Sequence, residues 1–236
     1  MEELFAMLGL SEPIPSLIDA VGSRKQVFGT VKDASSEAVQ TIVRRFMQEA
    51  KNNDLFLIRV GKINEAGSGC ACPHGAISRE ALSYPFATRT LVLVDAEAGI
   101  EYFGRGLDAR VEIILFIVDP SYDTMELCQE AKRLADSIAV RFIVVLNKVD
   151  SEDVSDFLRA ELSKRDVNVE FVIPYDNSLF RSTLLGRPLE IGAARNPLEE
   201  LVNTILSQSK PKEPHHTSSQ EDRAQERPPA HQRGGA

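Results

Sequence analysis

The sequence has few cysteines, no long apolar run and no surplus of basic residues. Only 3 of its 236 residues are cysteines, which is too few, and an odd number, for the disulfide framework of a secreted domain. No apolar run approaches the roughly 20 residues that span a bilayer, and the acidic start MEELFAML lacks the basic region of a signal peptide. The formal net charge of −8 argues against general nucleic-acid binding. We therefore expect a cytoplasmic protein with neither a membrane nor a nucleic acid as partner.

A further absence concerns phosphate binding. The motif G-x-x-x-x-G-K-[ST], whose backbone amides and lysine hold nucleotide phosphates, does not occur in the 236 residues. The only Gly-Lys pair, Gly61 and Lys62, is followed by isoleucine. A triphosphate would therefore lack its usual cradle in this sequence.

Two periodicities alternate along residues 35–207. Apolar, β-rich runs predict strands at 55–60, 90–95, 113–119, 141–146 and 169–173. Helical spacing and capping residues between them predict helices at 35–51, 122–138, 151–165 and 196–207. Alternation of this kind predicts an α/β fold with a doubly wound, mostly parallel sheet.

We expect one domain over residues 1–208, followed by a polar tail. Residues 209–236 contain no Val, Ile, Leu, Met or Phe, so they cannot bury enough apolar surface to offset their ordering entropy. This segment is predicted to be disordered. A weak metal-binding role for its His215–His216 pair is the less favoured interpretation.

Ligands of open α/β sheets bind at the carboxyl ends of the strands, where two motifs stand out. Asp95 ends the run LVLVD, a Walker-B-like pattern in which a carboxylate can hold Mg²⁺ beside a triphosphate. A strand-ending aspartate is also often a turn or cap residue. Asn147 begins NKVD, where an asparagine can recognise a purine edge: the pattern suggests guanine, as in GTPases, and Asn147 can also serve adenine, as in related ATPases. The alternative is a plain turn, with Asp150 or Ser151 capping the next helix.

Cys70 and Cys72 lie in the glycine-rich stretch EAGSGCACPHG. Residues i and i+2 of an extended loop face the same side, so two thiolates could hold one soft ion such as Zn²⁺, Ni²⁺ or Cu⁺. Because two ligands do not fill a tetrahedral site, a two-fold dimer would supply the other two. The alternative is a pair of unrelated small residues. Cys128 occupies an apolar position of a predicted helix and is expected in the core.

Taken together, GKINEAGSGCACPHG, LVLVDAEAGIEYFGRG, FIVDPSYDTMELCQEAKRLA, LNKVD and IPYDNSL resemble one family over residues 3–206. These segments are similar to the accessory ATPases that insert nickel into carbon monoxide dehydrogenase, which are MinD/ParA-type P-loop proteins with a deviant Walker motif. The resemblance implies that Asp95 is the switch aspartate near Mg²⁺ and that Asn147 contacts the adenine of ATP. Pro174 and Asp176 would lie close to the base.

The resemblance further implies that Cys70 and Cys72 pair with their copies in a homodimer and hold Ni²⁺ or Zn²⁺. ATP binding would close the dimer and hydrolysis would reopen it, coupling nucleotide state to metal delivery to a client such as carbon monoxide dehydrogenase.

The sequence departs from this family at its start, because the first strand and P-loop of the family have no counterpart here. We therefore expect a P-loop NTPase-like fold without that strand, and a 236-residue chain that neither hydrolyses ATP nor binds it tightly. Two alternatives remain open: a non-enzymatic metal-binding or docking protein derived from the family, and a ParA/MinD-like positioning protein.

Overall fold

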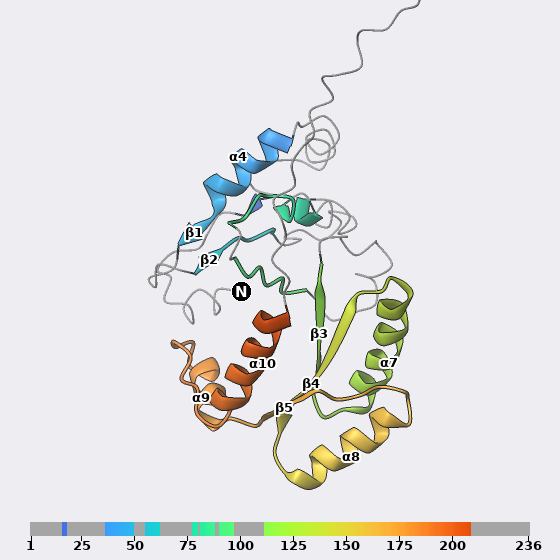
Figure 1. Cartoon of the computed structure of the whole chain (residues 1–236). Helices are drawn as coiled ribbons and strands as arrows, with labels where there is room; N and C mark the ends of the chain where they lie inside the picture. The colour runs from blue at the N-terminus through green and yellow to red at the C-terminus, as the bar shows by residue number, and fades with distance from the viewer. Residues whose placement is uncertain are drawn as a thin grey trace, which may run out of the picture.

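The computed structural model describes residues 16–17, 36–49, 55–61, 77–79, 81–87, 90–96 and 111–208 (Figure 1). The elements, in chain order, are α4 (Ser36–Phe46), β1 (Gln48–Glu49), β2 (Phe56–Leu57), β3 (Ile113–Val118), α7 (Tyr122–Ser137), β4 (Arg141–Val149), α8 (Glu152–Ser163), β5 (Phe171–Pro174), α9 (Asn177–Leu184) and α10 (Arg195–Gln208). The tail predicted at 209–236 lies outside the described residues.

The main sheet has three parallel strands in the order β3-β4-β5. Its register pairs Ile113 with Arg141 at one end of β3 and Val118 with Leu146 at the other. Helices α7 and α8 make the connections between successive strands, as parallel pairing requires. The predicted parallel α/β architecture is therefore confirmed.

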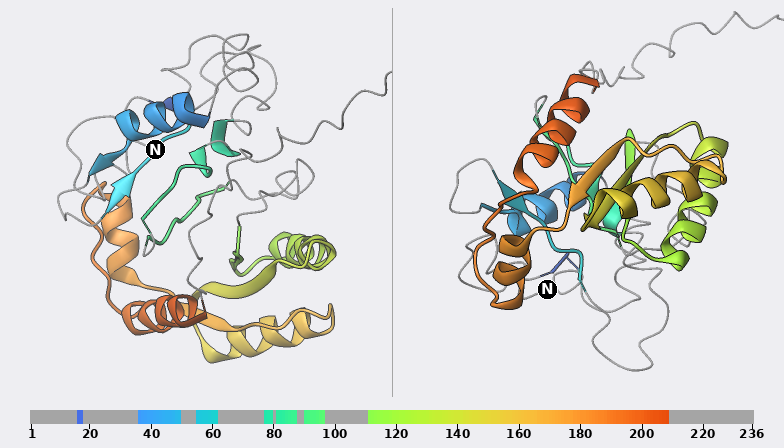
Figure 2. Two further views of the ribbon diagram at one scale, coloured as in Figure 1. Left: turned by 45° about the horizontal axis from the view of Figure 1, so that its top comes forward. Right: turned by 90° about the horizontal axis from the view of Figure 1, so that it is seen from below.

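Helices cover both faces of this sheet. Val144 and Leu146 of β4 pack in one apolar cluster with Cys128 of α7 and Leu162 of α8. The intervening β4 residues Ile143 and Val145 point to the opposite face and pack with residues of α10, including Leu201 and Ile205. Successive strand residues face opposite sides, so β4 is apolar throughout because both of its faces are buried. The right panel of Figure 2 shows α7 and α8 on one side of the sheet and α9 and α10 on the other, which confirms the doubly wound arrangement.

The amino-terminal part of the described chain forms a separate small core. Leu17, Val43, Ile77 and Ala81 are buried together there. Strand β2 is shorter than the strand predicted at 55–60 and pairs antiparallel with β1 rather than joining the parallel sheet.

The prediction of a strand at 90–95 is wrong, because residues 90–96 form no regular secondary structure. The apolar side chains of this run are exposed, Leu93 to 74%. The N–H of Thr90 bonds the carbonyl oxygen of Ala87 in a turn. An apolar run becomes a strand only where a neighbouring edge pairs with its backbone, and among the described residues this run has no such partner.

Candidate functional site

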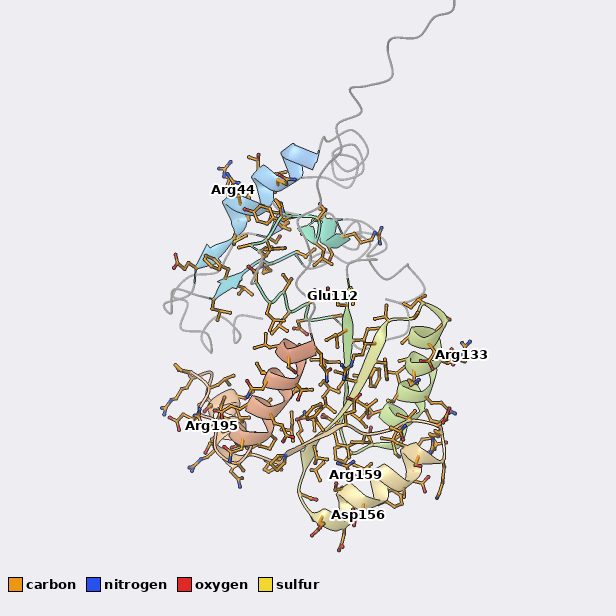
Figure 3. All side chains as sticks on the ribbon, in the orientation of Figure 1. Arg44, Glu112, Arg133, Asp156, Arg159 and Arg195 are labelled. Carbon is orange, nitrogen blue, oxygen red and sulfur yellow. The ribbon has the colours of Figure 1, made fainter. Side chains whose placement is uncertain are left out.

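Three parallel strands bring polar side chains to one edge of the sheet. Asp119 follows β3, Asn147 and Lys148 lie near the end of β4, and Asp176 lies two residues beyond β5. In Figure 3 the label of Glu112 marks the amino end of β3, so this edge is at the opposite end of the strands. Ser121 and Ser151 cap α7 and α8 at the same edge, each accepting a bond from a backbone N–H of the first turn. Helix N-termini and polar side chains thus converge where open α/β proteins bind ligands.

Asp119 links the ends of β3 and β4. Its Oδ1 accepts a hydrogen bond from Nδ2 of Asn147 at 3.0 Å. Its Oδ2 accepts a bond from Nζ of Lys148 at 2.6 Å, and both side chains of this ion pair are substantially exposed. One carboxylate therefore holds two consecutive side chains of the NKVD sequence.

A β-bulge at the end of β4 makes this arrangement possible. Leu146 pairs with Val172 and Val149 with Pro174, so β4 has one more residue than β5 between these two pairs. Lys148 adopts the left-handed conformation, with φ of 56°. For a residue with a Cβ this conformation costs roughly 1 kcal/mol. The bulge allows the consecutive side chains of Asn147 and Lys148 to reach the same carboxylate, although neighbours in a regular strand point to opposite faces.

Asp176 acts as a clamp between two segments. Its Oδ1 accepts bonds from the backbone N–H groups of Ser178 and Leu179, at 2.8 and 3.2 Å, and so caps α9. Its Oδ2 accepts bonds from the backbone N–H groups of Gly192 and Ala194, at 2.7 and 3.0 Å. These donors, Ala194 foremost, hold the pKa of the Asp176 carboxyl below its usual value, against the opposing effect of burial. The carboxylate is fully engaged by the backbone, and Asp176 is only 7% exposed.

Aromatic side chains lie beside this edge. The N–H of Tyr175 donates to the carbonyl oxygen of Val149 at 2.7 Å, which fixes Tyr175 next to the end of β4. The ring centroids of Tyr175 and Phe180 are 6.1 Å apart, and both rings are partly exposed. An exposed aromatic pair near the end of β4 offers an apolar surface for a flat ligand.

The structure brings together only part of the predicted site. Asn147, Pro174 and Asp176 lie at the common edge, whereas Asp95 is exposed on the irregular segment 90–96. No hydrogen bond or ion pair joins Asp95 to these residues within the described parts of the chain. Cys70 and Cys72 lie outside the described residues, so their predicted roles stay predictions.

The remaining cysteine behaves as expected. Cys128 is fully buried, and burial raises the pKa of its thiol to about 12. It therefore stays protonated and is a core residue rather than a ligand. In the ranges that the structure describes, no three His, Cys, Asp or Glu residues are grouped so that they could hold a metal ion. In the same ranges, no helix has both the length and the apolar character needed to cross a bilayer.

The strand predicted at 113–119 ends at Asp119, but no function was predicted for this residue. The signal was the run IILFIVD, which has the same form as LVLVD. The bond between Asp119 and Asn147 agrees with the register, because Val118 pairs with Leu146 and the next residues of the two strands are therefore neighbours. The bulge that adds Lys148 has no sequence signal, since no glycine marks it.

These features define an α/β protein with polar side chains gathered at the carboxyl edge of its parallel sheet, and sequence comparison relates it to ATP-binding proteins. ATP-binding protein MJ0084 of Methanocaldococcus jannaschii is 28% identical over 213 residues, covering 86% of this chain and 82% of that protein. ATP-binding protein MJ0823 of the same organism is 30% identical over 66% of this chain and 62% of its own length. The carbon monoxide dehydrogenase accessory protein CooC of Rhodospirillum rubrum is 31% identical over 125 residues, 52% of this chain and 47% of that protein.

The resemblance found in the sequence is therefore confirmed: homologues of this chain are ATP-binding proteins, and one is a carbon monoxide dehydrogenase accessory protein. No family model matches the chain. A ParA family ATPase from Chlorobium tepidum TLS aligns with a TM-score of 0.47 and 16% identity, covering 87% of this chain and 88% of that one. The fold assignment rests on the sheet order and helix placement described above.

Proposed function

We propose that the chain is an ATP-binding accessory protein for maturation of a metalloenzyme in the cytoplasm, and that the carboxyl edge of its parallel sheet binds the adenine base. The observation that carries this proposal is the position of Asn147, held by Asp119 at the edge where the three strands end. An asparagine amide pairs well with the N6 and N7 atoms of adenine. The names of the homologues, several of them ATP-binding proteins, support the same ligand.

The residues present fit the base better than they fit the phosphates. Asn147 and the aromatic ring of Tyr175 offer hydrogen bonds and a flat apolar face. No phosphate-cradling motif occurs in the 236 residues, and Asp95 is a single exposed carboxylate. ATP with Mg²⁺ would use Asp95 as a metal ligand and Asn147 with residues 174–176 at the base. We therefore propose weak binding through the base and no hydrolysis by the 236-residue chain.

The second part of the proposal concerns a transported metal. Cys70 and Cys72 would hold Ni²⁺ or Zn²⁺ together with the same residues of a second copy in a homodimer, since four thiolates complete a tetrahedral site. The client would be a metalloenzyme such as carbon monoxide dehydrogenase, as the name of one homologue suggests. In this view the metal is cargo that the accessory protein passes on.

Nucleotide binding is tested by NMR titration of the full 236-residue chain with ATP, because chemical-shift changes detect binding even in the millimolar range. We expect shifts at residues around Asn147 and Tyr175. Asn147→Ala should weaken the binding, so that the same shifts appear only at higher ATP concentration. Asn203→Ala, a change on the outer side of α10, is the matched control and should leave the titration unchanged. Absence of any ATP-dependent shift would contradict base binding, and turnover above background would contradict the absence of hydrolysis.

The metal site is tested by measuring bound nickel and zinc in purified protein together with its oligomeric state. Cys70→Ser and Cys72→Ser should each lose stoichiometric metal while keeping the fold. Cys128→Ser is the control, because that thiol is buried and protonated. Full metal content in either of the first two variants would disprove the ligand assignment.

A non-enzymatic metal-binding protein is the alternative, favoured by the absence of a phosphate-binding motif from the sequence. The two functions differ in how ATP affects metal uptake. ATP-dependent uptake supports the accessory ATP-binding function, whereas metal binding that ignores ATP supports the alternative.

A further inference from the structure

We propose that Asp119 makes this site select adenine over guanine, by fixing the orientation of the Asn147 amide. The inference rests on the proposed function, because it assumes that Asn147 contacts a purine. It adds a positioning residue that does not itself need to contact the nucleotide.

The carboxylate of Asp119 is held from two sides. The pairing of Val118 with Leu146 places Asp119 beside Asn147 at the end of the ladder. Nδ2 of Asn147 donates to one carboxylate oxygen at 3.0 Å, and Nζ of Lys148 donates to the other at 2.6 Å. Lys148 thus occupies the second oxygen, so the first one remains directed at Asn147.

An ionised carboxylate can only accept hydrogen bonds. Asn147 must therefore turn its NH₂ group, and not its carbonyl oxygen, toward Asp119. One of the two N–H bonds is used in this contact, which leaves one N–H donor and the carbonyl acceptor for a ligand. The amide thus presents one donor next to one acceptor.

That pattern matches adenine and not guanine. The N7 and N6 positions of adenine are an acceptor and a donor, whereas the N7 and O6 positions of guanine are both acceptors. Binding guanine along this edge would place its O6 against the carbonyl oxygen of Asn147. Turning the amide around would remove that repulsion only by breaking the bond to Asp119 and directing the carbonyl oxygen at its carboxylate.

The test compares the ratio of ATP to GTP affinity, measured by NMR titration, in the full chain and its variants. We expect the unaltered protein to prefer ATP. Asp119→Ala should reduce this preference by roughly five- to ten-fold, because a single part-buried hydrogen bond, from Asn147 to Asp119, enforces the orientation. Asp150→Ala is the matched control. Asp150 is an exposed carboxylate of the same NKVD sequence that accepts from the Ser151 hydroxyl, so its loss should leave the ratio unchanged.

A double-mutant cycle separates positioning from a general structural effect. If Asp119 acts through Asn147, then Asp119→Ala should not change the ratio further in an Asn147→Ala background. Asp119→Asn keeps the size of the side chain but adds an N–H donor, so it no longer forces the NH₂ group of Asn147 toward it and should also weaken the ATP preference. Its similar size guards against a folding defect in the alanine variant. Thermal unfolding of each variant accompanies the titrations.

The outcomes distinguish this inference from the function on which it rests. If the unaltered protein binds ATP through Asn147 but a folded Asp119→Ala variant keeps the full ATP preference, the role of Asp119 is overturned and the proposed function stands. If folded Asp119→Asn keeps the full ATP preference, the explanation through an acceptor-only carboxylate is overturned. If the unaltered protein binds neither nucleotide, both the proposed function and this inference fall.

Discussion

Asp176 and Ala194 are 18 positions apart in the chain, yet the backbone N–H of Ala194 donates to Oδ2 of Asp176 at 3.0 Å. The N–H of Gly192 donates to the same oxygen at 2.7 Å. A Cβ added to Gly192 would lie 3.2 Å from Oδ1 of Asp176, so the loop approaches closely at a residue without a side chain. Asp176 thereby joins the start of α9 to the segment that leads into α10.

Asp176→Asn should separate the two halves of this clamp. An asparagine still caps a helix well, so its oxygen can accept from Ser178 and Leu179. Its NH₂ group would then face the N–H groups of Gly192 and Ala194, two donors without an acceptor. We expect a clear fall in the thermal midpoint and faster amide exchange at Gly192 and Ala194, with α9 still protected. Uniform protection in the variant would show that the carboxylate does not hold this loop.

The same carboxylate predicts a pH dependence of stability. Hydrogen bonds led by that of Ala194 lower the pKa of Asp176 from its usual 3.8 in the folded state. A lowered folded pKa contributes stability above the unfolded value, and that stability is lost as the pH falls through the folded pKa. The difference in thermal midpoint between the unaltered protein and Asp176→Asn should be constant above about pH 5 and shrink as the pH falls below about 4.

The pKa values of Glu130 and Glu161 are also lowered, through hydrogen bonds from Arg133 and Lys164 respectively, so these carboxyls contribute to the acid dependence of stability as well. The unaltered protein and Asp176→Asn both retain these two ion pairs. The contribution of the pairs therefore cancels in the difference between the two thermal midpoints. If the difference in thermal midpoint stays the same below about pH 4, the pH dependence does not come from Asp176.

The central sheet was predictable because each of its strands is apolar on both faces. The runs at 113–119, 141–146 and 169–173 all became strands, since α7, α8 and α10 supply the burial that their composition requires. The run at 90–95 has the same composition and is exposed. Composition predicts a need for burial, but it cannot tell whether a neighbouring edge exists to pair with the backbone.

The candidate site was predictable in position but not in its contacts. The alternation of strands and helices places Asn147 and Asp176 at one edge, as the sequence suggested. Two of the four backbone amides that bond Asp176, those of Gly192 and Ala194, belong to a loop 16 and 18 residues away, and no local pattern reveals such contacts. The left-handed Lys148 is equally hidden, because lysine is not a residue that favours this conformation.

The thiols of the native protein should react in two distinct classes. Cys128 is fully buried with a pKa raised to about 12 by burial, so it should react with a thiol reagent only after unfolding. Cys70 and Cys72 are proposed metal ligands and should react in the native, metal-free protein. Mass spectrometry of alkylated protein, before and after denaturation, assigns each site. Rapid native modification of Cys128 would contradict its burial.

The C-termini of α7 and α9 share one geometry with different residues, which predicts stability changes of opposite sign. After α7, the N–H groups of Ala139 and Val140 bond the carbonyl oxygens of Asp136 and Ala135, and Ala139 has φ of 53°. After α9, Gly186 occupies the equivalent left-handed position with φ of 58°.

Ala139→Gly should stabilise the protein by roughly 1 kcal/mol, because glycine adopts this conformation without the strain of a Cβ. Gly186→Ala should destabilise the protein by a similar amount. Backbone strain is the only cause here, because a Cβ at Gly186 would meet no atom within 4 Å. Denaturant unfolding of both variants measures the two changes against one reference. Because the two substitutions are the reverse of each other, a change of the same sign in both would show that the left-handed conformation does not control the stability of these helix ends.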